Sequence, residues 1–308
     1  MVIYAPVALF VYNRPWHVRQ TVEALLANAE AKDTDLHIFA DAAKDGQATK
    51  AVSAVRSYIN EITGFKSVNI IERETNLGLA RSIIDGVTQM CNQYGRVIVL
   101  EDDLVTSPYF LKFMNDGLVS FADDERVISI SGYTYPVADV LPETFFLRGA
   151  DCWGWATWKR GWDLFEQDGQ YLLEQLIGQK LADKFDFDDS YPYVRMLKSQ
   201  IAGKNNSWAI RWYASAFLKN KLTLYPGSSL VLNIGLDGSG THCSSTVVHE
   251  VDLARAPIRV GTVPVEESAW ARQAFIAFHL KSHKNVFIKA YRKVAAAFKR
   301  RIGYSETK

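Results

Sequence analysis

Short runs of β-branched and aromatic residues alternate with longer amphipathic segments through the first 130 of the 308 residues. The runs are four to six residues long, and the segments between them are 14 to 16 residues long. Strands of this length that alternate with helices form βαβ units, whose parallel strands are covered by helices on both faces. Strands are expected at 7–12, 36–40, 68–71, 97–100 and 127–130, and helices at 16–29, 47–61, 78–93 and 107–121. The pattern predicts an α/β fold with a mostly parallel, Rossmann-like sheet.

The second half of the chain has a different character. The alternation ends after about residue 132, and aromatic residues become dense, as in WGWATWKRGW at 153–162. An apolar strand is expected at 222–234, and it leads into the glycine-rich stretch GLDGSGTH at 235–242. Because no repeat or low-complexity linker separates the halves, both are expected to pack on one sheet.

Composition narrows the class of protein. Hydrophobic residues make up 48% of the chain, which is enough for a substantial core. The three cysteines are widely spaced and form no C-x-x-C, so neither a zinc site nor a disulfide framework is expected. The N-terminus shows no secretion-signal pattern, and no stretch approaches 18 uninterrupted apolar residues. A cytoplasmic protein is therefore expected.

Polar residues follow the predicted strands at the point where each strand ends. Ligands of parallel sheets bind outside the carboxyl ends of the strands, so these residues are candidates for a site. Neither G-x-G-x-x-G nor G-x-x-x-x-G-K-[ST] is present, which argues against a dinucleotide dehydrogenase and a P-loop enzyme. The candidates are Arg14 after the first run, Asp41 after the second, Asn76 after the third and Glu101, Asp102 and Asp103 after the fourth.

The acidic triplet at 101–103 is informative because of its position. Three carboxylates cannot all be buried unpaired, since removing water from a carboxylate costs several kcal/mol. The triplet at 123–125 follows no buried-type strand and is expected to be a solvated turn. Because it lies at the end of an apolar strand, the triplet at 101–103 predicts a site for a divalent cation that also binds phosphate. The carboxylate that does not bind the cation would be free to accept hydrogen bonds from sugar hydroxyls.

Two further stretches each allow a functional and a structural interpretation. His242, directly after the glycine-rich stretch, is a candidate metal ligand, although a lone histidine is also common in a core. Most tryptophans of 153–162 are expected in the core, with one or two lining a cleft. Asp151 beside them could take a proton from a hydroxyl group.

The C-terminal tail is basic. Residues 281–301 contain eight Lys/Arg and no acid, and residues 302–308 are neutral on balance, so a net charge of +1 leaves −7 on the first 280 residues. At about 100° per residue, Phe287, Tyr291, Val294 and Phe298 form an apolar stripe opposite the basic side chains. The pattern predicts a basic amphipathic helix that binds an anionic membrane surface, or one that packs on the body. Nucleic acid is not expected as a partner, because the body is acidic.

The sequence resembles nucleotide-diphospho-sugar transferases of the GT-A fold. It is especially similar to the bacterial polysaccharide glycosyltransferases related to the N-acetylglucosaminyltransferase that initiates complex N-glycans. The resemblance covers about residues 5–245. It rests on VALFVYNRP at 7–15, FADAAKDG at 39–46, NLGLARS at 76–82, VLEDDL at 99–104 and SLVLNIGLDGSGTH at 229–242.

The resemblance implies roles for individual residues in binding a UDP-sugar donor. Asp103 would coordinate Mn²⁺ or Mg²⁺, the metal for which His242 is the candidate further ligand on the grounds of its position. Arg81, within NLGLARS, is expected among the donor-binding residues. Arg14 would contact the diphosphate, Asp41 the uracil ring, Asn76 the ribose side, and Glu101 and Asp102 the donor sugar and ribose.

The catalytic base is the point where this chain departs from the family pattern. Relatives of this kind invert the anomeric centre with a carboxylate base that often follows the first Trp of a stretch similar to SWAIRW at 207–212, but here that position is Ala209. Asp151 and Asp237 are the candidates to replace it. The chain is expected to be a single domain over 1–265, with a nucleotide-binding half at 1–132 and an acceptor half at 133–265, followed by an extension at 266–308.

The expected activity is transfer of a hexose or N-acetylhexosamine to a glycan or lipid-linked glycan in polysaccharide or lipopolysaccharide synthesis. With a basic tail, the protein would act in the cytoplasm, peripheral to the inner face of the cell membrane. Two alternatives remain. One is a catalytically degenerate protein that binds glycan or membrane, which Ala209 favours. The other is a sugar nucleotidyltransferase, whose glycine-rich loop after the first strand is replaced here by YNRPWH at 12–17.

Overall fold

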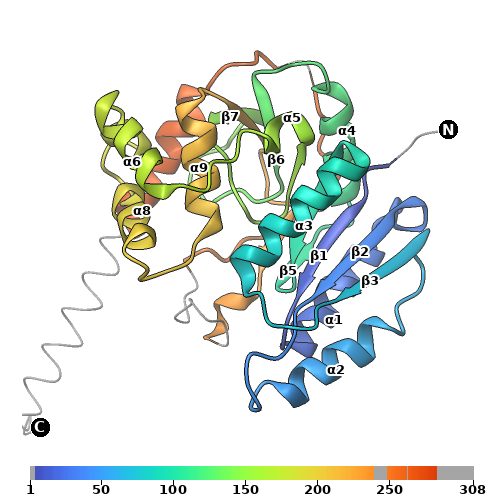
Figure 1. The fold of residues 1–308 in the computed structure, drawn as a ribbon. Coiled ribbons are helices and arrows are strands. Elements are labelled where there is room, and N and C mark those ends of the chain that lie inside the picture. The colour runs from blue at the N-terminus through green and yellow to red at the C-terminus, as the bar shows by residue number, and fades with distance from the viewer. Residues whose placement is uncertain (1–3, 239–247, 262, 283–308) are drawn as a thin grey trace, which may run out of the picture.

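The structure is a computed structural model, and it describes residues 4–238, 248–261 and 263–282 (Figure 1). The predicted alternation in the first half is confirmed. The strands are β1 (Val7–Val11), β2 (Asp35–Ala40), β3 (Ser67–Glu72), β4 (Arg96–Glu101) and β6 (Val127–Ser131). The helices between them are α1 (Pro15–Leu26), α2 (Thr49–Ile59), α3 (Leu79–Tyr94) and α4 (Phe110–Ser120), and β5 (Leu104–Thr106) follows β4. Pro15 begins α1, where its missing N–H has no intrahelical partner to lose.

The strands of the described residues form an eight-stranded sheet in the order β3-β2-β1-β4-β8-β6-β9-β7. The first four run parallel, with Val7 opposite both Leu36 and Ile98. The second half adds β7 (Thr144–Arg148), β8 (Trp155–Trp158) and β9 (Leu222–Pro226) to the same sheet. The fold is therefore a mixed α/β fold with a mostly parallel sheet, as predicted. The domain boundaries at 132 and 265 stay predictions.

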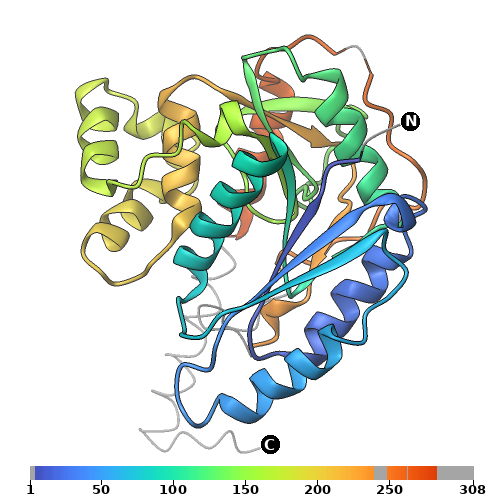
Figure 2. The same ribbon diagram turned by 45° about the vertical axis from the view of Figure 1, so that its right-hand side comes forward.

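Helices cover both faces of the sheet because successive strand residues point to opposite sides. Leu9 packs with residues of α1, α2 and α4 on one face, whereas its neighbours Ala8 and Phe10 pack with α3 on the other. Figures 1 and 2 show the strands between the pair α1 and α2 and the helix α3. The β4 residues 97–100 are fully buried, which explains their uninterrupted apolar sequence.

The helices of the second half form a group beside the sheet (Figure 1). They pack with β7 around a third core cluster, which includes Phe145, Leu176, Phe185 and Phe217. Residues 269–282 are also helical, and their Phe275 joins this cluster. The helices of this group are α6 (Gly169–Gly178), α7 (Ala182–Phe185), α8 (Tyr193–Ile201) and α9 (Trp208–Leu218), whereas the short α5 (Lys159–Trp162) lies apart from it, against α3, β6 and β8.

The single strand predicted at 222–234 is wrong. It is divided into β9 and β10 (Val231–Asn233), and β10 leaves the large sheet to pair antiparallel with β5. The break falls at Gly227, which packs against the backbone of Pro142 and Glu143, where a Cβ would not fit. The resulting β5–β10 ribbon carries residues 234–237 to the carboxyl end of β4.

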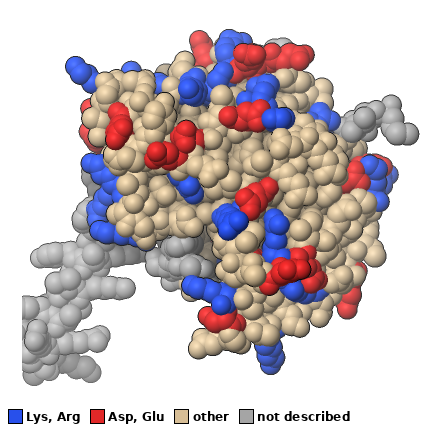
Figure 3. Space-filling model, in the orientation of Figure 1, with Lys and Arg blue, Asp and Glu red and all other residues tan. Residues whose placement is uncertain are grey.

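No helix of the described residues is long and apolar enough to span a membrane. The predicted basic helix at 281–301 lies outside the described residues except for its first two positions. On the face shown in Figure 3, acidic and basic side chains are interspersed.

Candidate active site

The carboxyl ends of β1, β2 and β4 bring together residues that are far apart in the sequence. Arg14 follows β1, Asp41 follows β2, and Asp102 and Asp103 follow β4. Because β1 lies between β2 and β4 and all three are parallel, these ends meet at one edge of the sheet. The structure thus places the strand-end candidates along a common edge, where parallel α/β sheets bind ligands.

The guanidinium group of Arg14 bridges the two aspartates. Its Nη2 donates to Oδ1 of Asp102 and, at 2.8 Å, to Oδ2 of Asp103. The three side chains are 18%, 6% and 14% exposed, so the bridge is largely shielded from water. The peptide N–H of Tyr12 lies 3.4 Å from Oδ2 of Asp102, and the Thr21 hydroxyl donates to the Asp102 carbonyl at 2.8 Å. Residues of β1 and α1 therefore hold Asp102 in position.

The charges at this edge do not balance. Burial, together with the charges of Asp103 and Asp102, raises the pKa of Glu101 to about 8 against the opposing effect of Arg14. Burial raises the pKa of Asp102 to about 6, with Arg14 lowering it and Asp103 raising it further. The pKa of Arg14 is raised by the two aspartates in spite of burial. One arginine thus leaves excess negative charge among three carboxylates, and a further cation would stabilise it.

The segment after β10 packs against Asp103. The Ile234 N–H donates to the Asp103 carbonyl at 2.9 Å. A Cβ at Gly235 would overlap Oδ2 of Asp103 and lie 2.8 Å from Nη1 of Arg14, so only glycine fits there. The next turn, η2 (Gly235–Asp237), brings Asp237 to this edge. Sequence reasoning did not identify Gly235, because the contact joins positions 132 residues apart.

Asp237 approaches α1. Its Oδ2 lies 3.2 Å from Nε2 of the buried His17, in a polar contact whose angle falls outside that of a hydrogen bond. The Asp237 side chain is 45% exposed, so one side of it remains open to solvent. The predicted metal ligand His242, five residues further on, lies outside the described residues.

Asp41 organises the loop that precedes α3. Its Oδ1 accepts from the N–H groups of Ala42 and Leu77, and its Oδ2 accepts from the N–H of Gly78 and the side-chain amide of Asn76, all at 2.9–3.1 Å. The Asn76 amide also donates to the Ala42 carbonyl at 2.7 Å. Asp41 and Asn76 are thus brought together as a structural pair, and their contacts with uracil and ribose stay predictions.

Arg81 lies on the first turns of α3 and points toward solvent. Its side chain is 70% exposed, and its Nε lies 3.5 Å from Asp85 on the same helix. The structure does not bring Arg81 into contact with Arg14 or the triplet through any hydrogen bond or ion pair of the described residues.

Asp151 lies in an aromatic environment on the other side of the site. Burial raises its pKa to about 6, although the Cys152 N–H donates to it at 2.7 Å. Its charge raises the pKa of Tyr133 and Tyr191, so both rings are close to it. Burial raises the pKa of Cys152, and the charges of Asp151, Glu101 and Asp103 raise it further. Cys152 therefore lies near both Asp151 and the acidic triplet.

The tryptophans near Asp151 divide between core and partly exposed positions. Trp155, Trp158 and Trp162 are buried. Trp153 is half-buried, with its ring 4.6 Å from Tyr133 and 5.5 Å from His249. Tyr133 and His249 were not singled out from the sequence, since isolated aromatic residues give no local signal.

Ala209 is the second residue of α9 and is half-buried. It packs against the cluster that contains Trp155, Trp208 and Trp212, as does Cys152. Its methyl group cannot accept a proton, so Ala209 cannot supply the base that the family resemblance implies. Among the candidates, Asp151 is the carboxylate coupled to Cys152.

The candidate metal ligands that the structure describes at this edge do not make up a complete set. Within the described ranges, no three His, Cys, Asp or Glu side chains converge to form a complete metal site. Mg²⁺-type cations are commonly held by one or two carboxylates together with substrate phosphates, and Asp103 beside excess negative charge fits that mode.

No family model and no curated protein sequence matches this chain. A solved structure that it resembles is that of TarS from S. aureus, residues 1–349, with 11% identity and a TM-score of 0.33. The match covers 51% of this chain and spans about half, 48%, of the TarS chain.

Proposed function

We propose that this protein is a metal-dependent glycosyltransferase of the GT-A type. It would move a sugar from a nucleotide-diphospho donor, a UDP-sugar, to a glycan or lipid-linked glycan, with inversion at the anomeric carbon. The observation that carries the proposal is the bridge from Arg14 to Asp102 and Asp103 at the carboxyl edge of the parallel strands. A guanidinium group beside carboxylates with excess negative charge supports binding of a diphosphate together with a cation.

Donor binding would depend on this edge. Arg14 has a planar, permanently charged group that suits a diphosphate, and Asp103 would hold Mn²⁺ or Mg²⁺ together with phosphate oxygens. When bound, the cation would neutralise the charge of the departing nucleoside diphosphate. Asp102 and Glu101 remain available to accept hydrogen bonds from donor hydroxyls, while Asp41 and Asn76 keep the loop at 76–78 in place.

Asp151 is the favoured base for the acceptor hydroxyl. With a pKa of about 6, it is largely ionised at neutral pH and still more basic than an exposed aspartate. The half-buried Trp153, whose ring packs against the buried Tyr133, offers an aromatic surface for a sugar ring. Turnover would rise with pH through about 6 if Asp151 acts in this way. Asp237 is the second candidate for the base, because it is partly exposed at the same edge.

Calorimetric titration of UDP, with and without Mn²⁺, tests the donor site. We expect binding that depends on Mn²⁺ and is lost in Asp103→Ala. Asp123→Ala, a change in the solvated triplet, is the matched control and should bind as the wild type does. Absent binding, or binding that is unaffected by the metal, would rule out the proposal.

A hydrolysis screen over nucleotide sugars separates an enzyme from the alternatives. Slow release of UDP from one donor, lost in Asp103→Ala, is expected of a transferase. Binding of UDP without any turnover would favour the degenerate binding protein. Formation of a nucleotide sugar from a nucleoside triphosphate and a sugar phosphate would instead identify a nucleotidyltransferase.

A further inference from the structure

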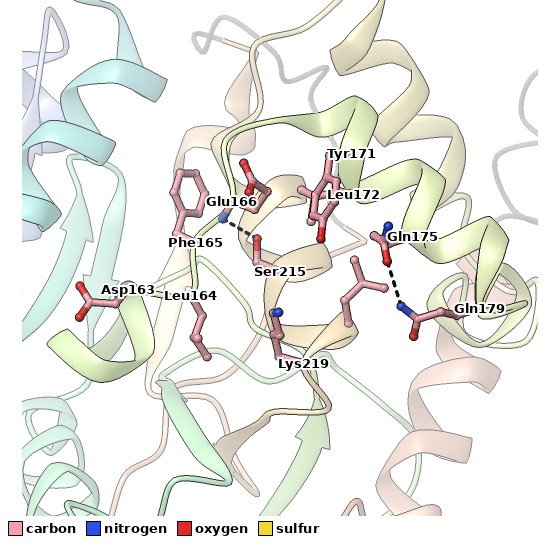
Figure 4. Close-up of a pocket in the computed structure, with 11 residues that line it drawn as sticks. Asp163, Leu164, Phe165, Glu166, Tyr171, Leu172, Gln175, Gln179, Ser215 and Lys219 are labelled. Carbon is pink, nitrogen blue, oxygen red and sulfur yellow. Dashed lines mark hydrogen bonds between the residues drawn. The ribbon is translucent and has the colours of Figure 1, made fainter.

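A cavity lies in the helical group of the second half, away from the strand ends. It encloses about 320 Å³ between α6, α9 and the segment 163–166. Figure 4 shows Tyr171 and Gln175 of α6 on one side and Ser215 of α9 with Lys219 on the other. None of its lining residues belongs to the carboxylate site, and its volume lies at the lower end of the range for small-ligand pockets.

The cavity has a rigid aromatic and aliphatic wall. The ring of Phe165 stacks on Trp162 at 4.6 Å with an interplanar angle of 7°, which fixes its orientation. The N–H of Glu166 donates to the Ser215 hydroxyl at 2.9 Å and ties the segment 163–166 to α9. Tyr171 is 47% exposed, so its ring and hydroxyl are accessible from the cavity.

Several polar groups around the cavity remain available to a ligand. One carboxylate oxygen of Glu166 accepts from the Asp168 N–H at 2.8 Å, which leaves the other oxygen open. The Gln179 amide donates to Oε1 of Gln175 in a long hydrogen bond of 3.4 Å. The amide nitrogen of Gln175 and the amide oxygen of Gln179 remain available to a ligand. Within the described part of the chain, no ion pair of Lys219 is found.

The charges and surfaces of the cavity limit the ligand class. Asp163 is neutralised by Lys159 at 2.6 Å, so Glu166 and Lys219 remain as one charge of each sign. A phosphate or nucleotide would need excess positive charge, and a lipid would need an apolar lining. A neutral saccharide matches this lining of polar groups and aromatic rings. Its hydroxyls both donate and accept hydrogen bonds, and its C–H face packs on an aromatic ring.

We propose that this cavity is a saccharide-binding subsite for one or two units of a neutral glycan. It is separate from the reaction centre. Helix α9 joins the two regions, since Ala209 packs near Cys152 at one end and Ser215 lines the cavity further along. Six residues of α-helix span about 9 Å. The cavity could therefore hold a glycan at a distance from Asp151, and the proposal stands whether or not the chain transfers a sugar.

Ligand-observed saturation-transfer NMR on the full chain tests the subsite, with maltotriose, chitotriose and N-acetyllactosamine as probes. We expect at least one probe to bind without metal or nucleotide. Tyr171→Ala should weaken its binding about tenfold, because the stacking surface is lost. Tyr171→Phe keeps the ring and should retain most of the affinity. Trp270→Ala is the control, because it removes an aromatic side chain that is 61% exposed on a different helix. This variant should bind the probe as the wild type does.

Two further variants make the outcome decisive. Asp103→Ala should bind the probe normally, which separates this subsite from the donor site. Lys219→Met should weaken binding without affecting the fold, since Lys219 is on the surface at the end of α9. This variant provides the test if Tyr171→Ala does not fold. Circular dichroism verifies folding in each case. If no probe binds, or if Tyr171→Ala and Lys219→Met both bind as the wild type does, the proposal is overturned.

Discussion

Gly235 packs its backbone against the carboxylate of Asp103, in a space where a Cβ would overlap Oδ2. The contact joins the β5–β10 ribbon to the end of β4, where the same Oδ2 accepts from Arg14 at 2.8 Å. A side chain at position 235 would therefore displace the Asp103 carboxylate and disturb its bond with Arg14. The glycine-rich stretch has a specific role at this position, which is to let the backbone approach the acidic triplet.

We expect Gly235→Ala to destabilise the protein by about 1–3 kcal/mol and to abolish Mn²⁺-dependent binding of UDP, because the carboxylate that would hold the cation is displaced. Urea denaturation and calorimetry measure the two effects. Gly46→Ala is the control, since a Cβ at Gly46 meets nothing within 4 Å. Unchanged UDP binding in Gly235→Ala would contradict the role given to Asp103.

Asp41 should matter for local order. Asp41→Ala leaves the N–H groups of Leu77 and Gly78 without their acceptor and removes one of the two acceptors of the Asn76 amide. Each unsatisfied buried donor costs about 1–3 kcal/mol, so we expect a clear loss of stability and faster hydrogen exchange at 76–78. Hydrogen exchange with mass spectrometry reports the local effect.

The matched control for Asp41 is Asp45→Ala. This residue accepts from the N–H groups of Gln47 and Ala48 in an exposed turn. It should change exchange in that turn alone. Unaltered exchange at 76–78 in Asp41→Ala would show that the loop is held by other contacts.

Asp151 should make stability depend on pH. Its pKa is raised from 3.8 to about 6 on folding, so the folded protein binds this proton more tightly than the unfolded chain does. Ionisation therefore destabilises the fold as pH rises from about 4 through about 6. Asp151→Asn escapes this penalty, and its stability relative to the wild type should increase by about 2 kcal/mol between pH 4 and pH 7.

Denaturant titration of the wild type and Asp151→Asn at a series of pH values measures the difference, in which the effects of other ionisable groups cancel. A difference that is the same at pH 4 and pH 7 would mean that burial does not raise this pKa.

The basic tail should bind an anionic membrane. The full chain is expected to sediment with vesicles of phosphatidylglycerol and phosphatidylcholine, and to lose this binding at high salt or when residues 283–308 are deleted. The deletion removes seven of the eight basic residues of 281–301 and leaves the helix at 269–282 intact. Vesicles of phosphatidylcholine alone are the control. Equal sedimentation of the truncated protein would refute the role of the tail.

Much of the nucleotide-binding half could be predicted because its signals are local. A buried parallel strand must be apolar along its whole length, and the helices between strands need one apolar face, so both appear as patterns in adjacent residues. The rule that ligands bind at the carboxyl ends of such strands then identified Arg14, Asp41 and the triplet. The structure places them at one edge of the sheet.

The second half could not be predicted equally well, because its organisation depends on distant contacts. The stretch 222–234 was predicted as one strand, yet it breaks at Gly227, where the backbone of Pro142 and Glu143 lies against it. The link from Asp151 through Cys152 to the triplet joins residues about 50 positions apart and leaves no local pattern.

The sequence alone thus determined the α/β class and the strand-end residues, since short-range periodicity specifies strands, helices and their order. The tertiary structure decided how charge is distributed at the site. Packing brings one arginine to two of three carboxylates, places Gly235 against Asp103, and buries Asp151 among tyrosines. These relationships depend on which side chains, distant in the sequence, are buried next to one another. Only the folding of the whole chain brings them together.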